Sequence, residues 1–194
     1  MTEPRIPMLD ADEAKKVAVE AGVPEYMADL NIFRVLFKHP KLARAFNDLL
    51  GQLLFRNTLD QRLRELLIMR IGWVTGSEYE WGQHWRVGKD FGVPADDLGA
   101  VRDWRSHDGW SDADRAVLAA TDEILEAGAV SDETWAACVA HVEGGETALL
   151  ELFMAIGGWR MVSGFLRSLQ IPIEPFTESW PPDGAAPDPA GVHG

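Results

Sequence analysis

Apolar residues recur every three or four positions along most of the chain, which is the period of one face of an α-helix. The clearest stripe lies in PKLARAFNDLLGQLLF (residues 40–55), where leucine and phenylalanine return at this spacing. Alternating β-branched runs bounded by Asn-Gly or Asp-Gly, which would indicate strands, are absent from the sequence. The pattern therefore predicts an all-α fold of eight or nine helices.

Capping residues indicate where these helices begin and end. Asp10 opens the first helix and Gly22 closes it. Two later helices open on Ser-Asp pairs at Ser111 and Ser131, because a serine side chain can accept a hydrogen bond from a free backbone N–H. Thr58 is expected to cap the helix that continues through RELLIMRIGWVTG.

That helix is apolar on almost every side between residues 66 and 74, so we expect several neighbours to bury it. Gly76 ends it, and Ser77 opens the next helix over residues 78–91. Glu80 stands three positions after Ser77, which is the S-x-x-E pattern of a capping box.

Proline replaces helical periodicity at the C-terminal end. The segment IPIEPFTESWPPDGAAPDPAGVHG contains no basic residue and no repeating apolar face. We predict one all-α domain over residues 1–173 and a Pro-rich extended or disordered tail over residues 174–194.

Composition excludes several classes of function. The chain carries 18 basic and 31 acidic residues, a net charge of −13. Nucleic acids and anionic membranes require a basic surface, so neither is an expected partner. The single Cys138 excludes an internal disulfide and a CxxC pair. No apolar run reaches the roughly 18 residues of a membrane span, and the first residues lack a signal peptide's apolar core, so a cytoplasmic location is expected.

The segment SEYEWGQH (residues 77–84) carries the candidate chemistry. Glu80 and His84 lie one helical turn apart, where a carboxylate can orient an imidazole and raise its pKa. Spacing alone favours a solvent-facing contact over an active site. Glu65 is either a solvated helix residue or a buried carboxylate directed at His84. These three groups are of metal-ligand type, but no HExxH-type motif accompanies them, so no metal is expected.

The stretch LRELLIMRIGWVTGSEYEWGQHWRVGKDFGVP resembles the carboxymuconolactone decarboxylase family, which also contains the alkylhydroperoxidase D-like proteins. The peroxidase branch has a Glu, then a CxxC that starts twelve positions later, then a His four positions after that pair. The matching residues here are Glu65, Ser77, Glu80 and His84, so both cysteines are replaced. Thiol–disulfide chemistry needs both thiols. The resemblance therefore implies the decarboxylase-type branch, which lacks the CxxC.

This resemblance implies an all-α fold of that type and assembly as a homo-oligomer, as a trimer or hexamer. It also implies a carbon–carbon lyase that acts on a small organic acid or lactone by acid–base catalysis, without metal or cofactor. His84 would donate or shuttle the proton, while Glu80 and Glu65 orient it and tune its pKa. The substrate would contact Ser77, Tyr79 and Trp81.

Two alternatives remain open. The first is a non-catalytic oligomeric protein of the same fold that binds a small molecule. The second, which we rank last, is a thiol peroxidase that uses Cys138 with an external thiol. Cys138 lies in TWAACVAHV, where a small buried apolar role fits a cysteine better than a nucleophilic one.

Overall fold

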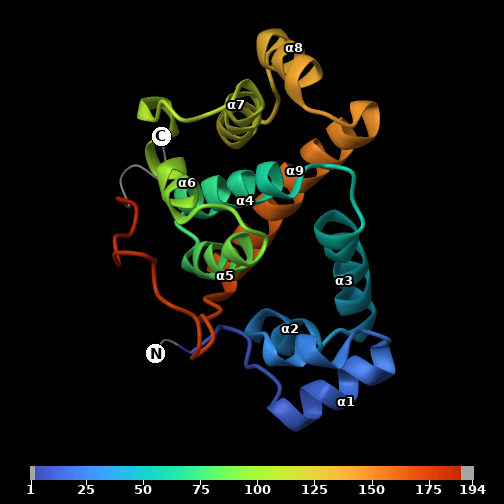
Figure 1. Cartoon of the computed structure of the whole chain (residues 1–194). Coiled ribbons are helices and arrows are strands. Elements are labelled where there is room, and N and C mark those ends of the chain that lie inside the picture. The colour runs from blue at the N-terminus through green and yellow to red at the C-terminus, as the bar shows by residue number, and fades with distance from the viewer. Residues whose placement is uncertain (1–2, 189–194) are drawn as a thin grey trace. The chain divides into compact units, whose positions relative to one another are not determined.

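The computed structural model describes residues 3–188, which contain nine α-helices, two 3-10 helices and no strand (Figure 1). The predicted all-α fold class is confirmed. The helices are α1 (Ala11–Ala21), η1 (Glu25–Asp29), α2 (Asn31–Leu36), α3 (Pro40–Phe55), α4 (Gln61–Thr75), α5 (Glu78–Asp90), α6 (Ala95–Ala100), η2 (Val101–Ser106), α7 (Asp112–Ala127), α8 (Asp132–His141) and α9 (Gly145–Leu169).

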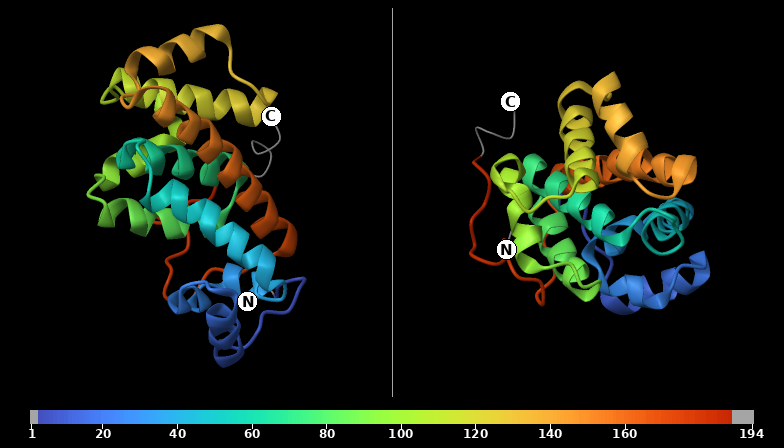
Figure 2. Two further views of the ribbon diagram at one scale, coloured as in Figure 1. Left: turned by 90° about the vertical axis from the view of Figure 1, so that its right-hand side faces the viewer. Right: turned by 45° about the horizontal axis from the view of Figure 1, so that its top comes forward.

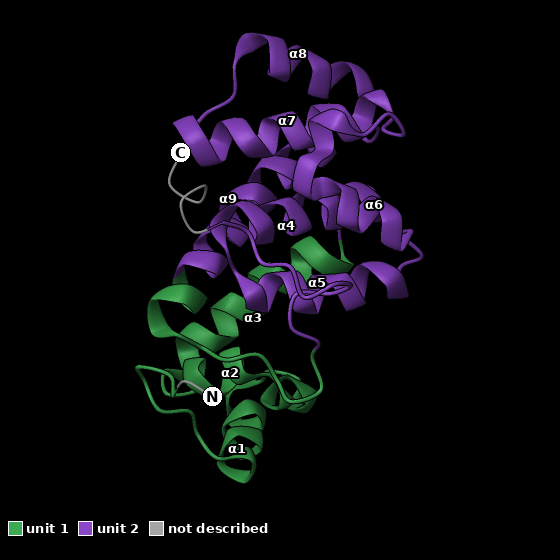
Figure 3. Ribbon diagram, turned by 90° about the vertical axis from the view of Figure 1, so that its left-hand side faces the viewer, with its two compact units in different colours: residues 1–56, 165–177 green, residues 57–164, 178–194 purple. Residues whose placement is uncertain are grey.

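Two compact units make up the chain (Figure 3). Unit 1 spans residues 1–56 and 165–177, and unit 2 spans residues 57–164 and 178–194. The domain boundary at residue 173 stays a prediction. Of the predicted tail, residues 189–194 lie outside the described part of the chain.

Unit 1 is built from α1, η1, α2 and α3 together with the last residues of α9. The Asp10 side chain accepts a hydrogen bond from the backbone N–H of Glu13, and Gly22 ends α1 with a positive φ of 70°. Both predicted ends of this helix are confirmed. At the start of α2, the buried Glu174 carboxylate accepts a hydrogen bond of 2.8 Å from the backbone N–H of Asn31.

Unit 2 is organised around α4, which packs against α5, α6, η2 and α7. Leu66 to Met69 are fully buried, as the all-round apolar pattern predicts. Gly72 allows α5 to approach closely, because a Cβ atom at this position would lie 3.1 Å from the backbone nitrogen of Trp81. Helices α7 and α8 pack against each other in the same unit (Figure 2).

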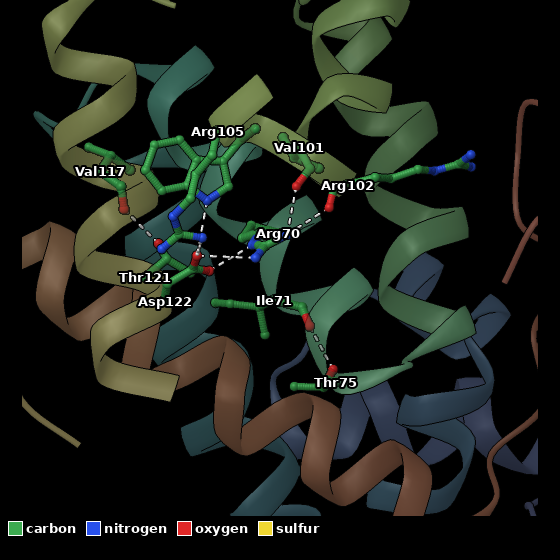
Figure 4. Close-up of polar contacts among 10 residues, drawn as sticks. Arg70, Ile71, Thr75, Val101, Arg102, Arg105, Val117, Thr121 and Asp122 are labelled. Atoms are coloured by element: carbon green, nitrogen blue, oxygen red, sulfur yellow. Dashed lines mark hydrogen bonds and ion pairs between the residues drawn. The ribbon is translucent and has the colours of Figure 1, made fainter. Parts of the chain in front are cut away.

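A buried carboxylate ties three elements of unit 2 together (Figure 4). Asp122 on α7 accepts two hydrogen bonds from Arg70 on α4, of 2.7 and 3.1 Å. It accepts two more from the Trp104 indole and the Arg105 guanidinium of η2. Burial opposes ionisation of Asp122, but these donors outweigh it and hold its pKa below the ordinary value. These hydrogen bonds link α4, α7 and η2.

The long helix α9 presents two different faces. Its buried face includes Leu152, Ile156 and Trp159, whereas Leu150 and Met154 are exposed. Although no uninterrupted apolar run reaches membrane-spanning length, α9 is long and apolar enough overall to cross a membrane. Core helices share this property, and 44% of its most apolar window is buried.

Candidate acid–base site

Helices α4 and α5 bring Glu65, Glu80 and His84 together inside unit 2. The Glu65 Oε2 atom lies 2.7 Å from His84 Nδ1, and the Glu80 Oε2 atom lies 3.6 Å from His84 Nε2. The exposed fractions of these residues are 0%, 4% and 7% respectively. The structure thus shows Glu65 as a buried carboxylate directed at His84, and the Glu80–His84 pair as buried rather than solvent-facing.

Glu65 is held in its charged form by two partners. Its Oε1 atom accepts a hydrogen bond of 2.9 Å from Arg64 Nε, and its other oxygen contacts His84. Burial alone would raise the pKa of Glu65, but His84 and Arg64 together lower it. Arg64 is itself fully buried, with its guanidinium 4.9 Å from the centre of the Phe91 ring. A buried Arg–Glu–His chain therefore anchors the imidazole at Nδ1.

Glu80 behaves in the opposite way. Burial is the largest influence on its carboxyl, and it raises the pKa of Glu80 to about 7. Nearby His84 partly counteracts this effect, while the negative charge of Glu65 adds to it. Of the two carboxyl groups, Glu80 is therefore the one that holds a proton near neutral pH.

Trp159 on α9 completes the surroundings of His84. Its Nε1–H donates a hydrogen bond of 3.1 Å to His84 Nε2, and the two rings meet edge to face at 5.7 Å. An indole N–H can only donate, so Nε2 must be the acceptor and Nδ1 carries the hydrogen that points to Glu65. Sequence reasoning missed the contact of Trp159 with His84 and the burial of Arg64 beside Glu65, because periodicity does not show which side chains of different helices meet.

Ser77 stands at the N-cap position of α5, but the predicted capping box is wrong. Its side chain makes no cap hydrogen bond, and its ψ of 92° differs from the values near 165° at the capping residues Asp10 and Ser111. The reason is that its backbone N–H is bonded to the carbonyl of Gly72 at the end of α4. The buried Ser77 hydroxyl has no hydrogen-bond partner within residues 3–188.

The other two predicted substrate contacts lie elsewhere on α5. Tyr79 is buried, five positions before His84, which turns it roughly 140° away around the helix. Trp81 is fully buried among aromatic rings, including Trp73 and Trp180, and its indole N–H donates a 2.7 Å hydrogen bond to the Pro181 carbonyl. The structure therefore brings Glu65, Glu80 and His84 together, while the Trp81 indole is engaged with Pro181 and neighbouring tryptophans.

No group of three or more His, Cys, Asp or Glu side chains among the described residues is arranged to hold a metal ion. Cys138 is fully buried, and its thiol lies 3.6 Å from the Ala116 carbonyl. Burial, helped by the charge of Glu123, raises the pKa of Cys138 to about 11. A thiol in this state is a poor nucleophile at neutral pH.

The raised pKa of Glu80 predicts a pH-dependent stability. A native state that binds the proton more tightly than the unfolded chain loses this advantage as pH rises from about 4.5 to about 7. We expect Glu80→Gln to become more stable relative to wild type across that range, by about 3 kcal/mol at most. Urea unfolding of both proteins at several pH values measures this difference. A difference that stays constant with pH would show that Glu80 titrates normally.

Residues 40–123 match the sequence model of the carboxymuconolactone decarboxylase family. Solved structures of the AhpD-like fold agree with this match. The match assigns residues 40–123 to the carboxymuconolactone decarboxylase family. The family predicted from the segment between Glu65 and His84 is thus confirmed, whereas no curated protein matches the chain.

The fold is shared with several solved structures at low sequence identity. One is an alkylhydroperoxidase AhpD core, a peroxidase-related protein from Ralstonia eutropha JMP134, with a TM-score of 0.72, 15% identity and coverage of 90% of this chain and 94% of that one. A peroxidase-related protein from Silicibacter sp. TM1040 gives 0.69 at 13% identity, with 89% and 94% covered. A variant of the debrominase Bmp8 in complex with 2,3,4-tribromopyrrole gives 0.69 at 18% identity, with 90% and 94% covered. At these identities the likeness shows the fold alone.

Proposed function

We propose that the protein is a cofactor-independent acid–base enzyme that moves a proton to or from a small organic acid or lactone, with decarboxylation as the leading reaction. The observation that carries this proposal is a buried Glu80 carboxyl, protonated near neutral pH, beside a His84 anchored by Glu65. A group that titrates near the working pH is suited to general acid–base catalysis.

In the proposed decarboxylation, a proton replaces the carboxylate on the substrate carbon. The C–C bond to the substrate carboxylate breaks and CO2 leaves, while the bonding electron pair passes into the conjugated lactone as an enolate. Glu80 then gives its proton to the enolate carbon, so that hydrogen replaces CO2. Glu80 regains a proton from solvent through a transient His84 imidazolium, which passes the proton from Nε2 to Glu80 and returns to the neutral ring. The Ser77 hydroxyl is a hydrogen-bond donor for the lactone. Relative to the sequence-based hypothesis, the proton donor is thus Glu80 and His84 relays the proton.

The thiol peroxidase alternative has little support. The two positions of the CxxC hold Ser77 and Glu80, and the remaining Cys138 is a buried, weakly acidic thiol. One solved relative of this fold is a debrominase in complex with a brominated pyrrole. That complex supports a small, flat ring as the kind of ligand that the fold accommodates, and it leaves the chemistry to the residues of each site.

The remaining alternative is a binding protein without turnover. We would incubate the wild type in D2O with 4-carboxymuconolactone and with the same lactone lacking the carboxyl group. The enzyme proposal predicts CO2 release from the first compound and deuterium incorporation into both. Binding of either compound, seen by calorimetry, without any product or exchange would favour the non-catalytic alternative.

We also propose that the protein acts as a homo-oligomer, through a surface of unit 2 that α8 and α9 expose. Leu150, Met154 and Met161 lie along one face of α9, and Trp135 and Val139 are exposed on α8. Between residues 150 and 164 the exposed positions of α9 carry one charged side chain, Arg160, which donates a hydrogen bond to the Ile124 carbonyl, and no acidic one. Because the whole chain carries −13, a second copy is repelled least at a surface without exposed acidic groups.

Placing a charge on this surface is expected to separate the subunits. Met154→Glu should shift the mass measured by light scattering from that of an oligomer to that of a monomer, because a buried unpaired charge is costly at an interface. Val19→Glu is the matched control, since Val19 is equally apolar and 62% exposed but lies on α1. A wild-type protein that is monomeric at every concentration would contradict the proposal.

A further inference from the structure

We propose that Trp159 is a positioning residue that keeps the shared proton of the Glu80–His84 pair on Glu80, an inference that rests on the proposed acid–base function. No sequence pattern assigns this tryptophan a role. It reaches the pair from α9, whereas Glu80 and His84 both belong to α5.

The argument begins with the hydrogen-bonding capacity of the two rings. A neutral imidazole has one nitrogen that donates and one that accepts, and an indole has only a donor. The 3.1 Å bond from Trp159 Nε1 to His84 Nε2 therefore uses the single acceptor of the His84 ring. If Nε2 became protonated, two N–H groups would face each other and the indole N–H would lose its partner.

The His84 ring cannot rotate to relieve this conflict, because its other nitrogen is held in place. Its Nδ1 is bonded to Glu65 at 2.7 Å, and Glu65 is in turn bonded to the buried Arg64. Trp159 is only 1% exposed, so water does not replace His84 as the acceptor of its N–H. An unpartnered buried N–H typically costs about 1–3 kcal/mol.

The consequence concerns Glu80, whose Oε2 lies 3.6 Å from the same Nε2 atom. The pair can hold its proton as a neutral carboxyl beside a neutral imidazole, or as a carboxylate beside an imidazolium. The charged groups that act on the pair are Glu65 and, through Glu65, Arg64, both from α4. Glu65 favours the imidazolium. Trp159, the uncharged neighbour from α9, opposes it and so favours the protonated Glu80 that the proposed reaction needs.

Trp159→Phe tests this role, because it removes the N–H and keeps an aromatic ring. The proton should then move towards Nε2, so that the infrared carbonyl band of the protonated Glu80 carboxyl disappears at a pH lower by about one unit. The ¹⁵N chemical shifts of His84 should change at neutral pH from those of a neutral ring to those of an imidazolium. Comparison with Glu80→Gln identifies the infrared band.

Trp110→Phe is the matched control. It also removes one buried indole hydrogen bond, of 2.9 Å to the Trp104 carbonyl, but outside the site. It should leave the His84 and Glu80 signals unchanged. Unchanged signals in Trp159→Phe would overturn the proposal.

If Trp159→Phe does not fold, the wild-type spectrum still decides. A protonated Nε2 in wild-type His84 near pH 6 would overturn the proposal, and an unprotonated, hydrogen-bonded Nε2 is the expected result. These spectra do not depend on turnover. Failure of the enzyme proposal therefore shows in the substrate assays alone, and failure of the positioning role shows in the spectra alone.

Discussion

Replacing Glu65 with leucine is expected to lower the free energy of unfolding by about 3–5 kcal/mol. The physical reason is the position of Arg64, which is fully buried and pairs with the Glu65 carboxylate at 2.9 Å. Removal of the carboxylate leaves a guanidinium charge in an apolar environment and deprives His84 Nδ1 of its acceptor. Urea unfolding, followed by circular dichroism, measures the change.

A double variant separates the lost ion pair from lost packing. In Arg64→Met combined with Glu65→Leu, no unpaired charge is buried, so most of the stability should return. The single variant Arg64→Met should resemble Glu65→Leu. A loss below about 1 kcal/mol in Glu65→Leu would contradict the view that Arg64, Glu65 and His84 form a buried chain held by the Glu65 carboxylate.

Replacing Glu80 with glutamine is expected to lower kcat by about 10²–10⁴-fold while the fold is kept. Glutamine matches the side chain in size but has no proton to give to the substrate carbon. For the wild type, kcat should fall as pH rises through about 7, because Glu80 then loses its proton. The variant should have lost that pH dependence together with its rate.

Glu78→Gln is the control for this experiment. Glu78 is in the first turn of the same helix, but its carboxylate accepts a hydrogen bond from Ser179 and does not contact His84. The rate of this variant should stay close to that of wild type. A Glu80→Gln variant that keeps more than about a tenth of the wild-type kcat would show that another group supplies the proton.

The helices could be predicted well where local chemistry decides their ends. Asp10, Ser111 and Ser131 each cap a helix as the sequence indicates. Thr58 does not: α4 begins later, and the Asp60 side chain accepts the capping hydrogen bond from Leu63. The backbone N–H of Thr58 instead donates to Glu151. That contact joins residues 93 positions apart, so no local pattern could reveal it.

The site also contains contacts that the sequence could predict and contacts that it could not. The approach of Glu80 to His84 follows from their spacing on one helix, and the approach of Glu65 follows from the family resemblance. The hydrogen bond from Trp159 does not follow from either, because it depends on how α9 packs against α5. The sequence also could not show that the Ser77 side chain makes no cap hydrogen bond. That outcome accompanies the hydrogen bond from the Ser77 backbone N–H to the Gly72 carbonyl at the end of α4. Contacts between distant helices were thus the part that periodicity could not supply.

The most direct measurement is the turnover of 4-carboxymuconolactone by the wild type and by His84→Ala, followed through loss of substrate and release of CO2. An acid–base site at Glu80 and His84 predicts turnover by the wild type and a loss of about 10²–10⁴-fold in His84→Ala, with an unchanged oligomer mass. Equal rates in the two proteins would contradict the assignment of the site to His84. Absence of turnover in both would contradict decarboxylation of this lactone as the reaction.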